Sequence, residues 1–219
     1  MTHPTWPLFD LRLRTPRIEL RPADEACTVD LMLLADRGVH PADEMPFQVP
    51  WTRLEPGRRK AEGMQFCWRC WANWSPDEWH LPFATYCDGE VVGMIELIAE
   101  TFPQRRVVGT GSWIGQEFQG RGFGTEQRAA VLAFAFEHLG ASRANSEAWE
   151  SNTASRRVSE KLGYRYNGDH IGVVDGAPKA GVNFTLDRAD WERERTTNPL
   201  HVPISVDGLD TARPMFGRL

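Results

Sequence analysis

The sequence predicts a layered α/β domain in which helices flank a mixed and mostly antiparallel sheet. Two hairpin patterns predict the antiparallel part, one around Asp88-Gly89 and one over residues 164–188. A strand–helix–strand pattern over residues 106–149 predicts one parallel crossover. Because no linker or repeat interrupts these elements, we expect a single domain over residues 1–196 and a C-terminal extension over residues 197–219.

The first half of the chain shows strand, helix, loop and helix patterns in turn. Residues 17–22 alternate apolar and polar side chains, as a strand does, and end at a proline. Asp24 is a typical N-cap for the helix that follows, and Gly38 is a natural stop for it. Residues 39–51 hold three prolines and predict a loop that is rich in apolar and aromatic side chains. Residues 58–74 are typical of a second helix.

The second half supplies the rest of the sheet. Asp88-Gly89 predicts a type I′ turn between two strands. Residues 106–115 predict the next strand, a helix ending at Gly140 follows, and residues 142–149 predict the strand that completes the crossover. Asn152 then opens a short helix in front of the last hairpin.

The composition limits the possible classes of protein. The 219 residues are 41% hydrophobic, which is enough to bury a sizeable core. The net charge of −5 does not suggest a nucleic-acid partner, since such proteins usually carry a basic excess. No run reaches the length of a membrane span, and the N-terminus lacks the regions of a signal peptide. We therefore expect no membrane partner and a cytoplasmic location.

The cysteines do not predict a metal site. Cys67 and Cys70 form a CxxC, but a structural zinc site needs four ligands and no second pair exists. His80 and Cys87 would be a strained substitute. The CxxC also lies inside a helical pattern rather than at a helix N-terminus, where a redox pair is activated. We interpret both cysteines as small apolar residues on a helix.

A glycine-rich stretch indicates a phosphate site. Gly120, Gly122 and Gly124 stand between a predicted strand and a predicted helix. Such a turn leaves backbone N–H groups pointing outward at the positive end of the helix dipole, where an anion binds. The spacing differs from the dinucleotide-binding pattern and lacks the Gly-Lys-Ser/Thr ending of a nucleoside-triphosphate loop. The sequence therefore nearly excludes a nucleotide-dependent redox enzyme.

Two motifs together resemble the GNAT superfamily of N-acetyltransferases. The first is Gln119-x-x-Gly122-x-Gly124, and the second is the group Asn152, Ser155, Gly163 and Tyr164. The segments "TPRIELRP", "MPFQVPW" and "FTLDRADW" resemble the RimJ/RimL-like branch, and most closely its actinobacterial acetyl- or succinyltransferase-like members. The resemblance covers residues 10 to about 195 and implies a six- to seven-stranded sheet.

The resemblance implies an N-acyltransferase that moves an acetyl or succinyl group from acetyl-CoA or succinyl-CoA to a primary amine. The strand around Trp113 and Ile114 should bulge and offer N–H groups to the thioester, while the pyrophosphate should lie on the N–H groups from Gln119 to Thr125. For Asn152 the spacing favours helix capping, whereas the family motif favours contact with CoA. The residues implied in CoA binding are Trp113, Ile114, Gln119, Gly120, Arg121, Gly122, Phe123, Gly124, Thr125, Asn152 and Ser155.

The catalytic residues follow the family only in part. The glutamate that many relatives carry on the strand before the glycine loop is replaced here by about Gly109. A second arrangement in the family implies Glu147 as the general base, because it stands five residues before the motif asparagine. The usual acid is a tyrosine, and Ser159 stands at its position. Ser159 could act through a water molecule or merely make room.

The acceptor and the quaternary state are less constrained. His40, Phe47 and Trp51 could line the pocket for an amine, which could belong to a protein N-terminus, a lysine or a small molecule. The C-terminal extension could pair at a sheet edge or form a dimer contact. A succinyl donor would need an arginine at the acyl end, and the sequence offers Arg53, Arg69 and Arg106. The alternative function is a CoA-binding module without turnover.

Overall fold

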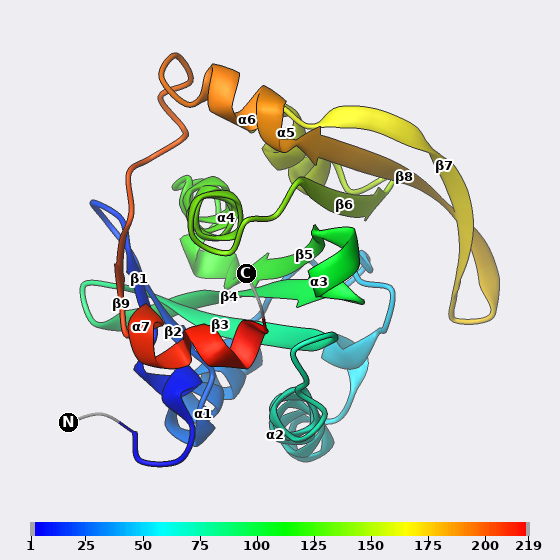
Figure 1. Cartoon of the computed structure of the whole chain (residues 1–219). Helices are drawn as coiled ribbons and strands as arrows, with labels where there is room; N and C mark the ends of the chain where they lie inside the picture. The colour runs from blue at the N-terminus through cyan, green and yellow to red at the C-terminus, as the bar shows by residue number, and fades with distance from the viewer. Residues whose placement is uncertain (1–2, 218–219) are drawn as a thin grey trace.

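One sheet runs through residues 3–217, which are the residues that this computed structural model describes (Figure 1). Its strands there are β1 (Arg12–Arg14), β2 (Glu19–Pro22), β3 (Trp79–Cys87), β4 (Glu90–Ala99), β5 (Val107–Ile114), β6 (Arg143–Trp149), β7 (Arg165–Val174), β8 (Ala177–Asp187) and β9 (Ser205–Asp207). Their order is β7-β8-β6-β5-β4-β3-β2-β1-β9. Every neighbouring pair is antiparallel except β5 and β6, so the predicted fold class is confirmed.

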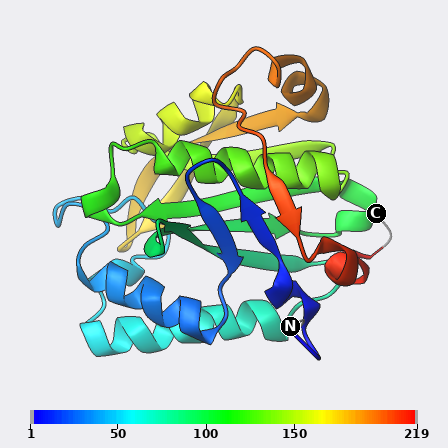
Figure 2. The ribbon, with the colours of Figure 1, turned by 90° about the vertical axis from the view of Figure 1, so that its left-hand side faces the viewer.

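Helices cover both faces of the sheet (Figure 2). On one face α1 (Glu25–Asp36) packs beside α2 (Pro56–Ala72), and on the other α4 (Phe123–Ala133) packs beside α5 (Thr153–Lys161). α4 is buried along almost its whole length and continues as a π-helical turn to His138. The shorter helices are α3 (Phe102–Arg105), α6 (Arg188–Glu194) and α7 (Leu209–Ala212). Within the described residues, no helix combines the length and the hydropathy needed to cross a bilayer.

The cap of α1 and the turns of the two hairpins form as the sequence predicts. The carboxylate of Asp24 accepts a hydrogen bond from the Cys27 N–H at 2.8 Å and so caps α1. Asp88 and Gly89 have φ values of 50° and 82°, as the predicted type I′ turn between β3 and β4 requires. The second hairpin turns in the same way between β7 and β8.

The sheet is wider than the expected six or seven strands. The described residues form nine, and the two short strands β1 and β9 have three residues each. Three residues are too few to show an alternation of apolar and polar side chains, so neither strand carries a period-2 signal in the sequence. Both lie at one edge of the sheet, far in the order from the β5–β6 pair.

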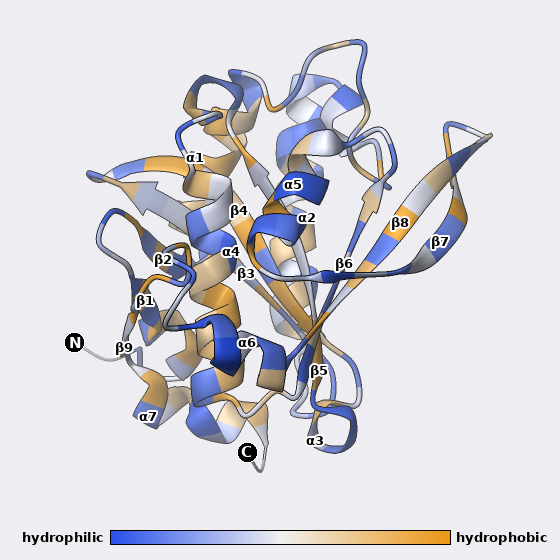
Figure 3. Ribbon diagram, turned by 90° about the horizontal axis from the view of Figure 1, so that it is seen from above, coloured by the Kyte–Doolittle hydropathy of each residue, from blue (hydrophilic) through white to orange (hydrophobic). Residues whose placement is uncertain are grey.

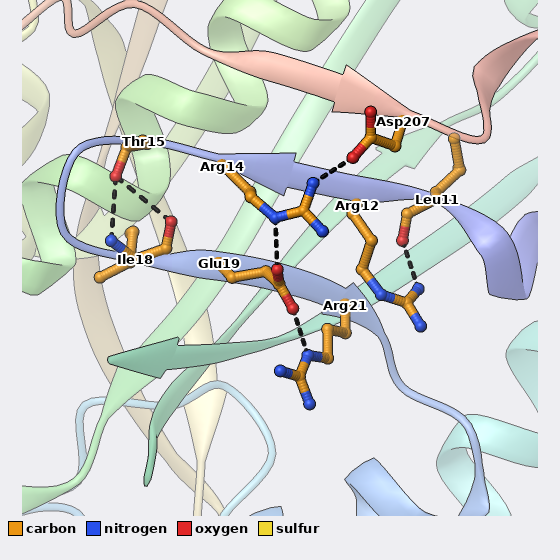
Figure 4. A network of polar contacts seen from close by, with 8 residues as sticks. All are labelled: Leu11, Arg12, Arg14, Thr15, Ile18, Glu19, Arg21 and Asp207. Atoms are coloured by element: carbon orange, nitrogen blue, oxygen red, sulfur yellow. Dashed lines mark hydrogen bonds and ion pairs between the residues drawn. The ribbon is translucent and has the colours of Figure 1, made fainter. Parts of the chain in front are cut away.

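The C-terminal residues are attached to this edge (Figure 4). β9 pairs with β1 in antiparallel register, and Asp207 forms an ion pair with Arg14. Arg14 also contacts Glu19 of β2 at 2.5 Å, so one guanidinium links β1, β2 and β9. Beyond β9, the side chains of Leu209, Ala212 and Phe216 are buried in the main hydrophobic core.

The opposite edge is formed by β7. Seen from above, the β7–β8 hairpin projects away from the body of the molecule (Figure 3). Three apolar side chains of β7 are more than half exposed there, namely Tyr166, Ile171 and Val173. The predicted dimer contact stays a prediction, because nothing in a single chain tests it.

We predict that the C-terminal residues stabilise the core. Phe216 is fully buried among the rings of Trp74, Trp79 and Phe134. Phe216→Ala should lower the free energy of unfolding by about 3–5 kcal/mol, measured by urea denaturation, because it removes a ring and leaves a cavity. The exposed Thr211→Ala is the matched control and should change it by less than about 0.5 kcal/mol. Equal small effects of both variants would contradict this role.

Candidate active site

The site begins where β5 and β6 separate. The two parallel strands pair from Val107–Arg143 to Gly109–Asn145, and within the described residues their pairing ends there. On its other side β5 keeps an unbroken register with β4 as far as Ile114. The bulge predicted around Trp113 and Ile114 is therefore wrong. The opening arises because two parallel strands diverge, which leaves backbone groups of both strands facing a gap.

The register decides which β5 groups face the gap. The N–H of Gly115 donates to the carbonyl of Val92 at 2.9 Å. In an antiparallel strand the backbone N–H groups of every second residue point to the same neighbouring strand. The N–H of Trp113 therefore also points to β4. The N–H groups of Ser112 and Ile114 consequently point to the β6 side. Of the two donors expected from the sequence, Ile114 faces the gap.

The glycine loop stands at one end of this gap, in front of α4. Gly120 and Gly122 have φ values of 75° and 86°, which glycine adopts without strain. Gly124 lies in the first turn of α4, where a Cβ would meet Ile114 at an ordinary 3.6 Å. The N–H groups of residues 120–124 donate to no protein group within the described part of the chain. They stand where the sequence predicts an anion site, and the binding of an anion there stays a prediction.

The ends of the predicted N–H range are used within the protein. The Gln119 N–H donates to the Gln116 carbonyl at 3.3 Å, and the Thr125 N–H donates to the Gly122 carbonyl at 3.1 Å. The side-chain amide of Gln119 donates to the carbonyls of Val39 and Ile114 at 2.7 and 3.0 Å. Gln119 therefore fastens the loop to the end of β5 and to the segment after α1. Phe123 is buried and contributes only backbone.

Two arginines add positive charge beside the loop. The exposed guanidinium of Arg121 lies over the Phe118 ring at 5.4 Å. Arg17, which the sequence analysis missed, donates to the Arg121 carbonyl at 3.1 Å and to the buried Glu126 carboxylate at 2.6 Å. No local signal could reveal Arg17, because it reaches the loop from the turn between β1 and β2.

The second motif forms the start of α5. Asn152 is the N-cap, and its side-chain oxygen accepts a hydrogen bond from the Ser155 N–H at 3.1 Å. This is the capping role that the spacing favours. The carbonyl of Ser155 accepts a hydrogen bond from the Ser159 hydroxyl at 3.3 Å. Both motif residues are partly exposed, so their contact with CoA stays a prediction.

Ser159 is not placed as a free acid. Its side chain is fully buried, and its hydroxyl accepts a hydrogen bond from the Arg128 guanidinium at 2.9 Å. Arg128 of α4 is itself only 4% exposed. The small serine thus makes room for an arginine that the sequence analysis did not single out.

Glu147 lies on β6 beside the gap. Its side chain is 53% exposed and accepts a hydrogen bond from the Gln48 amide at 2.5 Å, while His170 lies 4.0 Å away. By register, Glu147 stands level with Gly111 of β5, two residues beyond the last β5–β6 pair. Gly111 pairs with Glu96 of β4, so two carboxylates stand level on either side of the gap and on the same face.

A cavity of about 350 Å³ opens on this face, between the sheet and α1, α2 and the loop after α1. Phe47, Trp51 and Trp113 form an aromatic wall, in which the Trp51 ring lies 5.4 Å from Phe47 and 5.7 Å from Trp113. The polar lining side chains are those of Thr28, Arg59, Glu62, Arg69 and Glu96, and Ser112 of β5 also borders the cavity. The predicted pocket residues Phe47 and Trp51 therefore line a cavity, and residues of β5 line the same cavity.

His40 is not part of this lining. Its ring nitrogens contact the carbonyl of Pro41 at 2.8 Å and the hydroxyl of Thr52 at 2.7 Å. Both nitrogens are thus engaged inside the loop, and the ring packs edge-on against Phe47 at 5.7 Å. In the structure His40 holds the loop that carries Phe47 and Trp51, and its contact with an acceptor stays a prediction.

Glu96 is a second residue that the sequence analysis missed. Its carboxylate contacts the His80 ring nitrogen at 2.7 Å, and this contact raises the pKa of His80 above its ordinary value. The Cys70 thiol donates weakly to the same carboxylate at 3.9 Å. These three groups are the described cluster that could hold a metal ion, with ligand atoms within 4.8 Å. Burial raises the pKa of Cys70, which favours the neutral thiol, so hydrogen bonding explains the cluster.

The sequence of this chain is similar to those of known acetyltransferases. The sequence model of the acetyltransferase (GNAT) domain matches residues 17–165. YdaF of Bacillus subtilis (strain 168), provisionally named a ribosomal N-acetyltransferase, is 33% identical over 111 residues, which are 49% of this chain and 60% of YdaF. The prophage-derived N-acetyltransferase YokL of the same strain is 32% identical over 114 residues, with 50% and 62% covered. The matches thus span less than two thirds of these relatives.

Solved structures share the fold over a longer stretch. RimJ of Mycobacterium smegmatis, in complex with CoA-disulfide, superposes with a TM-score of 0.69 at 23% identity and covers 94% of this chain and 96% of its own. RimL, a ribosomal L7/L12 α-N-protein acetyltransferase in complex with CoA, gives 0.64 at 16% identity, with 79% and 95% covered. These likenesses concern the fold. The domain model matches more than half of the length of this chain, so this chain belongs to the GNAT acetyltransferase family.

Proposed function

We propose that the protein is an N-acetyltransferase that uses acetyl-CoA as donor and an amino group of another protein as acceptor. One observation carries this proposal: the unpaired N–H groups of residues 120–124 stand at the end of a gap between β5 and β6, and the gap adjoins an aromatic cavity. The loop suits the pyrophosphate of CoA. The gap suits its extended arm, because amides of the arm can pair with the exposed strand groups.

The lining of the cavity supports an amine acceptor. Glu62 and Glu96 face a space that Arg59 and Arg69 also line and whose walls are otherwise largely aromatic and aliphatic. Arg59 is already paired with Asp36, and Arg69 is exposed. An ammonium group is attracted by both carboxylates and by the faces of aromatic rings. The opening between the loop and α2 suits the end of a polypeptide, and the ribosomal acetyltransferase names of the relatives support a protein acceptor.

Glu147 is our proposed base. The attacking amine must lose a proton, and a positioned carboxylate accepts it either directly or through water. Glu147 is more exposed than Glu96, and among the described residues its one basic neighbour at ion-pair distance is the His170 ring at 4.0 Å. Glu96 is held by His80, so it is better suited to bind the incoming ammonium.

The same charges support an acetyl donor. Of the arginines considered for a succinyl group, Arg53 pairs with Asp175 and Arg106 donates to the Leu139 carbonyl. Arg69 lines the cavity but is exposed. An exposed ion pair contributes at most about 1 kcal/mol, and the two carboxylates of the cavity repel a second anion. A neutral acetyl group avoids this repulsion.

We predict that Gly122→Asp abolishes CoA binding. The new carboxylate would repel the pyrophosphate and occupy its place beside the Arg17 guanidinium, which would lie 3.2 Å from the new Cβ. In thermal denaturation, CoA at a hundredfold excess over its Kd should stabilise the wild type by about 2.7 kcal/mol and the variant by almost nothing. Gly89→Asp is the matched control, because Gly89 also has positive φ but lies in the β3–β4 turn. Equal stabilisation of Gly122→Asp and wild type would overturn the assignment of the loop.

We predict that Glu147→Gln lowers kcat by at least about tenfold and leaves CoA affinity unchanged, since the amide keeps the shape but cannot accept a proton. Thiol release with an amine panel measures kcat. The exposed Glu150→Gln, just beyond β6, is the control and should behave like the wild type. Unaltered turnover and pH profile in Glu147→Gln would make Glu147 a structural residue. A wild type that binds CoA and releases no thiol would instead be a CoA-binding module.

We predict that acetyl-CoA is preferred over succinyl-CoA by at least about tenfold in kcat/KM, because a succinyl carboxylate would meet Glu62 and Glu96. Direct competition of the two donors on one amine measures the ratio. Arg69→Met should leave the ratio almost unchanged. An equal or higher value for succinyl-CoA, lost in Arg69→Met, would contradict the acetyl assignment and identify Arg69 as the acyl-end cation.

A further inference from the structure

A buried arginine lies under the gap between β5 and β6. The guanidinium of Arg128 reaches from α4 and donates to three serine hydroxyls: Ser159 of α5 at 2.9 Å, Ser112 of β5 at 3.2 Å and Ser146 of β6 at 3.3 Å. The cation therefore touches both strands that diverge and the helix that follows β6.

Arg128 contacts β5 and β6 at positions beyond the last residues that pair between these two strands. Pairing between β5 and β6 ends at Gly109–Asn145, and Ser112 and Ser146 both come later in their strands. Ser112 pairs instead with β4, and Ser146 pairs with β8. Arg128 thus bridges the two sides of the open part of the gap, on the face that α4 covers.

The charge of Arg128 has no counter-ion among residues 3–217. None of the ion pairs of the described chain includes it, and its Nε is buried without a hydrogen-bond partner. Arginine does not lose its proton in proteins. Burial lowers the pKa of Arg128, and among the described residues the titratable group that opposes this shift is the phenol of Tyr164. Burial raises the pKa of that phenol to about 12, so it supplies no negative charge near neutral pH.

The stability of the fold does not explain why an unpaired arginine is buried at this position. A buried cation is expensive unless it is paired, and an apolar side chain of similar volume is usually tolerated at least as well. The three hydroxyls accept some of the hydrogen bonds that the guanidinium can donate. None of them carries a negative charge that would balance its positive charge. A buried cation with a free Nε, at the edge of a gap suited to a thioester, is matched to an anion that appears there during the reaction.

We propose that Arg128 is a catalytic residue, whose guanidinium binds the sulfur of CoA as the thiolate leaves. This inference rests on the proposed function, since it needs the CoA arm to enter the gap. Ser159, at the position where relatives carry an acid, then serves to orient Arg128 rather than to give a proton. The protein stabilises the leaving group by charge instead of protonating it.

The reaction balances with these groups. The amine nitrogen attacks the thioester carbonyl carbon and forms the C–N bond, while the C–S bond breaks and leaves its electron pair on sulfur. The acceptor that enters as an ammonium group loses two protons in all, one that frees the lone pair before the attack and one as the C–N bond forms. Glu147 accepts them in turn, directly or through water, and passes the first to solvent before it takes the second. The products are an amide and a CoA thiolate beside Arg128. The thiolate takes up a proton from solvent when CoA departs, and the carboxyl group of Glu147 returns its proton to solvent.

The test titrates the thiol of bound CoA in the intact protein, and it needs no turnover. Thiolate formation is followed by its ultraviolet absorbance, and the matched complex with desulfo-CoA, which lacks the sulfur, is subtracted. This removes the protein's own thiols and phenols. In the wild type the thiol of bound CoA should have a pKa about one to three units below that of free CoA, because a cation lies close to it. In Arg128→Met this shift should disappear, and Arg128→Lys should keep part of it.

Binding is measured separately by calorimetry with CoA, so that the two ideas can fail independently. Arg128→Met should bind CoA with a Kd within about tenfold of that of the wild type. Arg143 is an exposed arginine at the end of β6 that still pairs with β5, and Arg143→Met should leave the thiol titration unchanged. An unshifted thiol in a wild type that binds CoA would overturn the role of Arg128 alone. A shift that persists in a folded Arg128→Met would do the same. If Arg128→Met does not fold, the titration of Arg128→Lys and of the wild type decides. No binding of CoA to the wild type would overturn the proposed function itself.

Discussion

The divergence of β5 from β6 is the constraint on which the site depends. A parallel pair that parts after Gly109 and Asn145 exposes backbone groups of both strands in the middle of an otherwise continuous sheet. Unpaired groups of this kind are costly in a protein interior unless a ligand completes them. The crossover helix α4 starts at the same opening, so its free N–H groups and the exposed strand groups face one elongated ligand. The sheet, the helix dipole and the gap thus suit the donor that we propose, which has an anionic end and an amide-bearing arm.

The two faces of the sheet divide the chemistry between them. On the face of α1 and α2, Glu62, Glu96 and an aromatic wall line the cavity that we propose for the amine, and Glu147 lies nearby on β6. On the face of α4, a buried arginine and three hydroxyls lie under the gap. A thioester held between them would have its attacking nitrogen on the acidic side and its leaving sulfur on the cationic side. This separation of charge across one sheet explains why Glu96, Glu147 and Arg128 do not neutralise one another.

Local sequence signals predicted the parts of the molecule that are determined locally. Hairpin turns, the Asp24 cap, the glycine loop and the crossover depend on a few adjacent residues, and all of them appear in the structure. Arg17, Glu96 and Arg128 were missed because each acquires its role from residues far away in the chain. The three-residue strand β1 was missed because pairing, and not propensity, makes it a strand, whereas β9 pairs at a sheet edge, which is one of the two roles expected for the C-terminal extension. The bulge was expected by family resemblance, yet register shows that the opening lies on the other side of β5.

The central claim is that the arm and pyrophosphate of CoA occupy the gap and the glycine loop. Amide hydrogen exchange with and without CoA tests this claim most directly, because it reports on the backbone N–H groups themselves. The account predicts slower exchange in the presence of CoA for residues 120–124 and for Ser112 and Ile114, with no change at the exposed turn of Asp175-Gly176. Protection elsewhere, with unchanged exchange in the loop and at the end of β5, would contradict it.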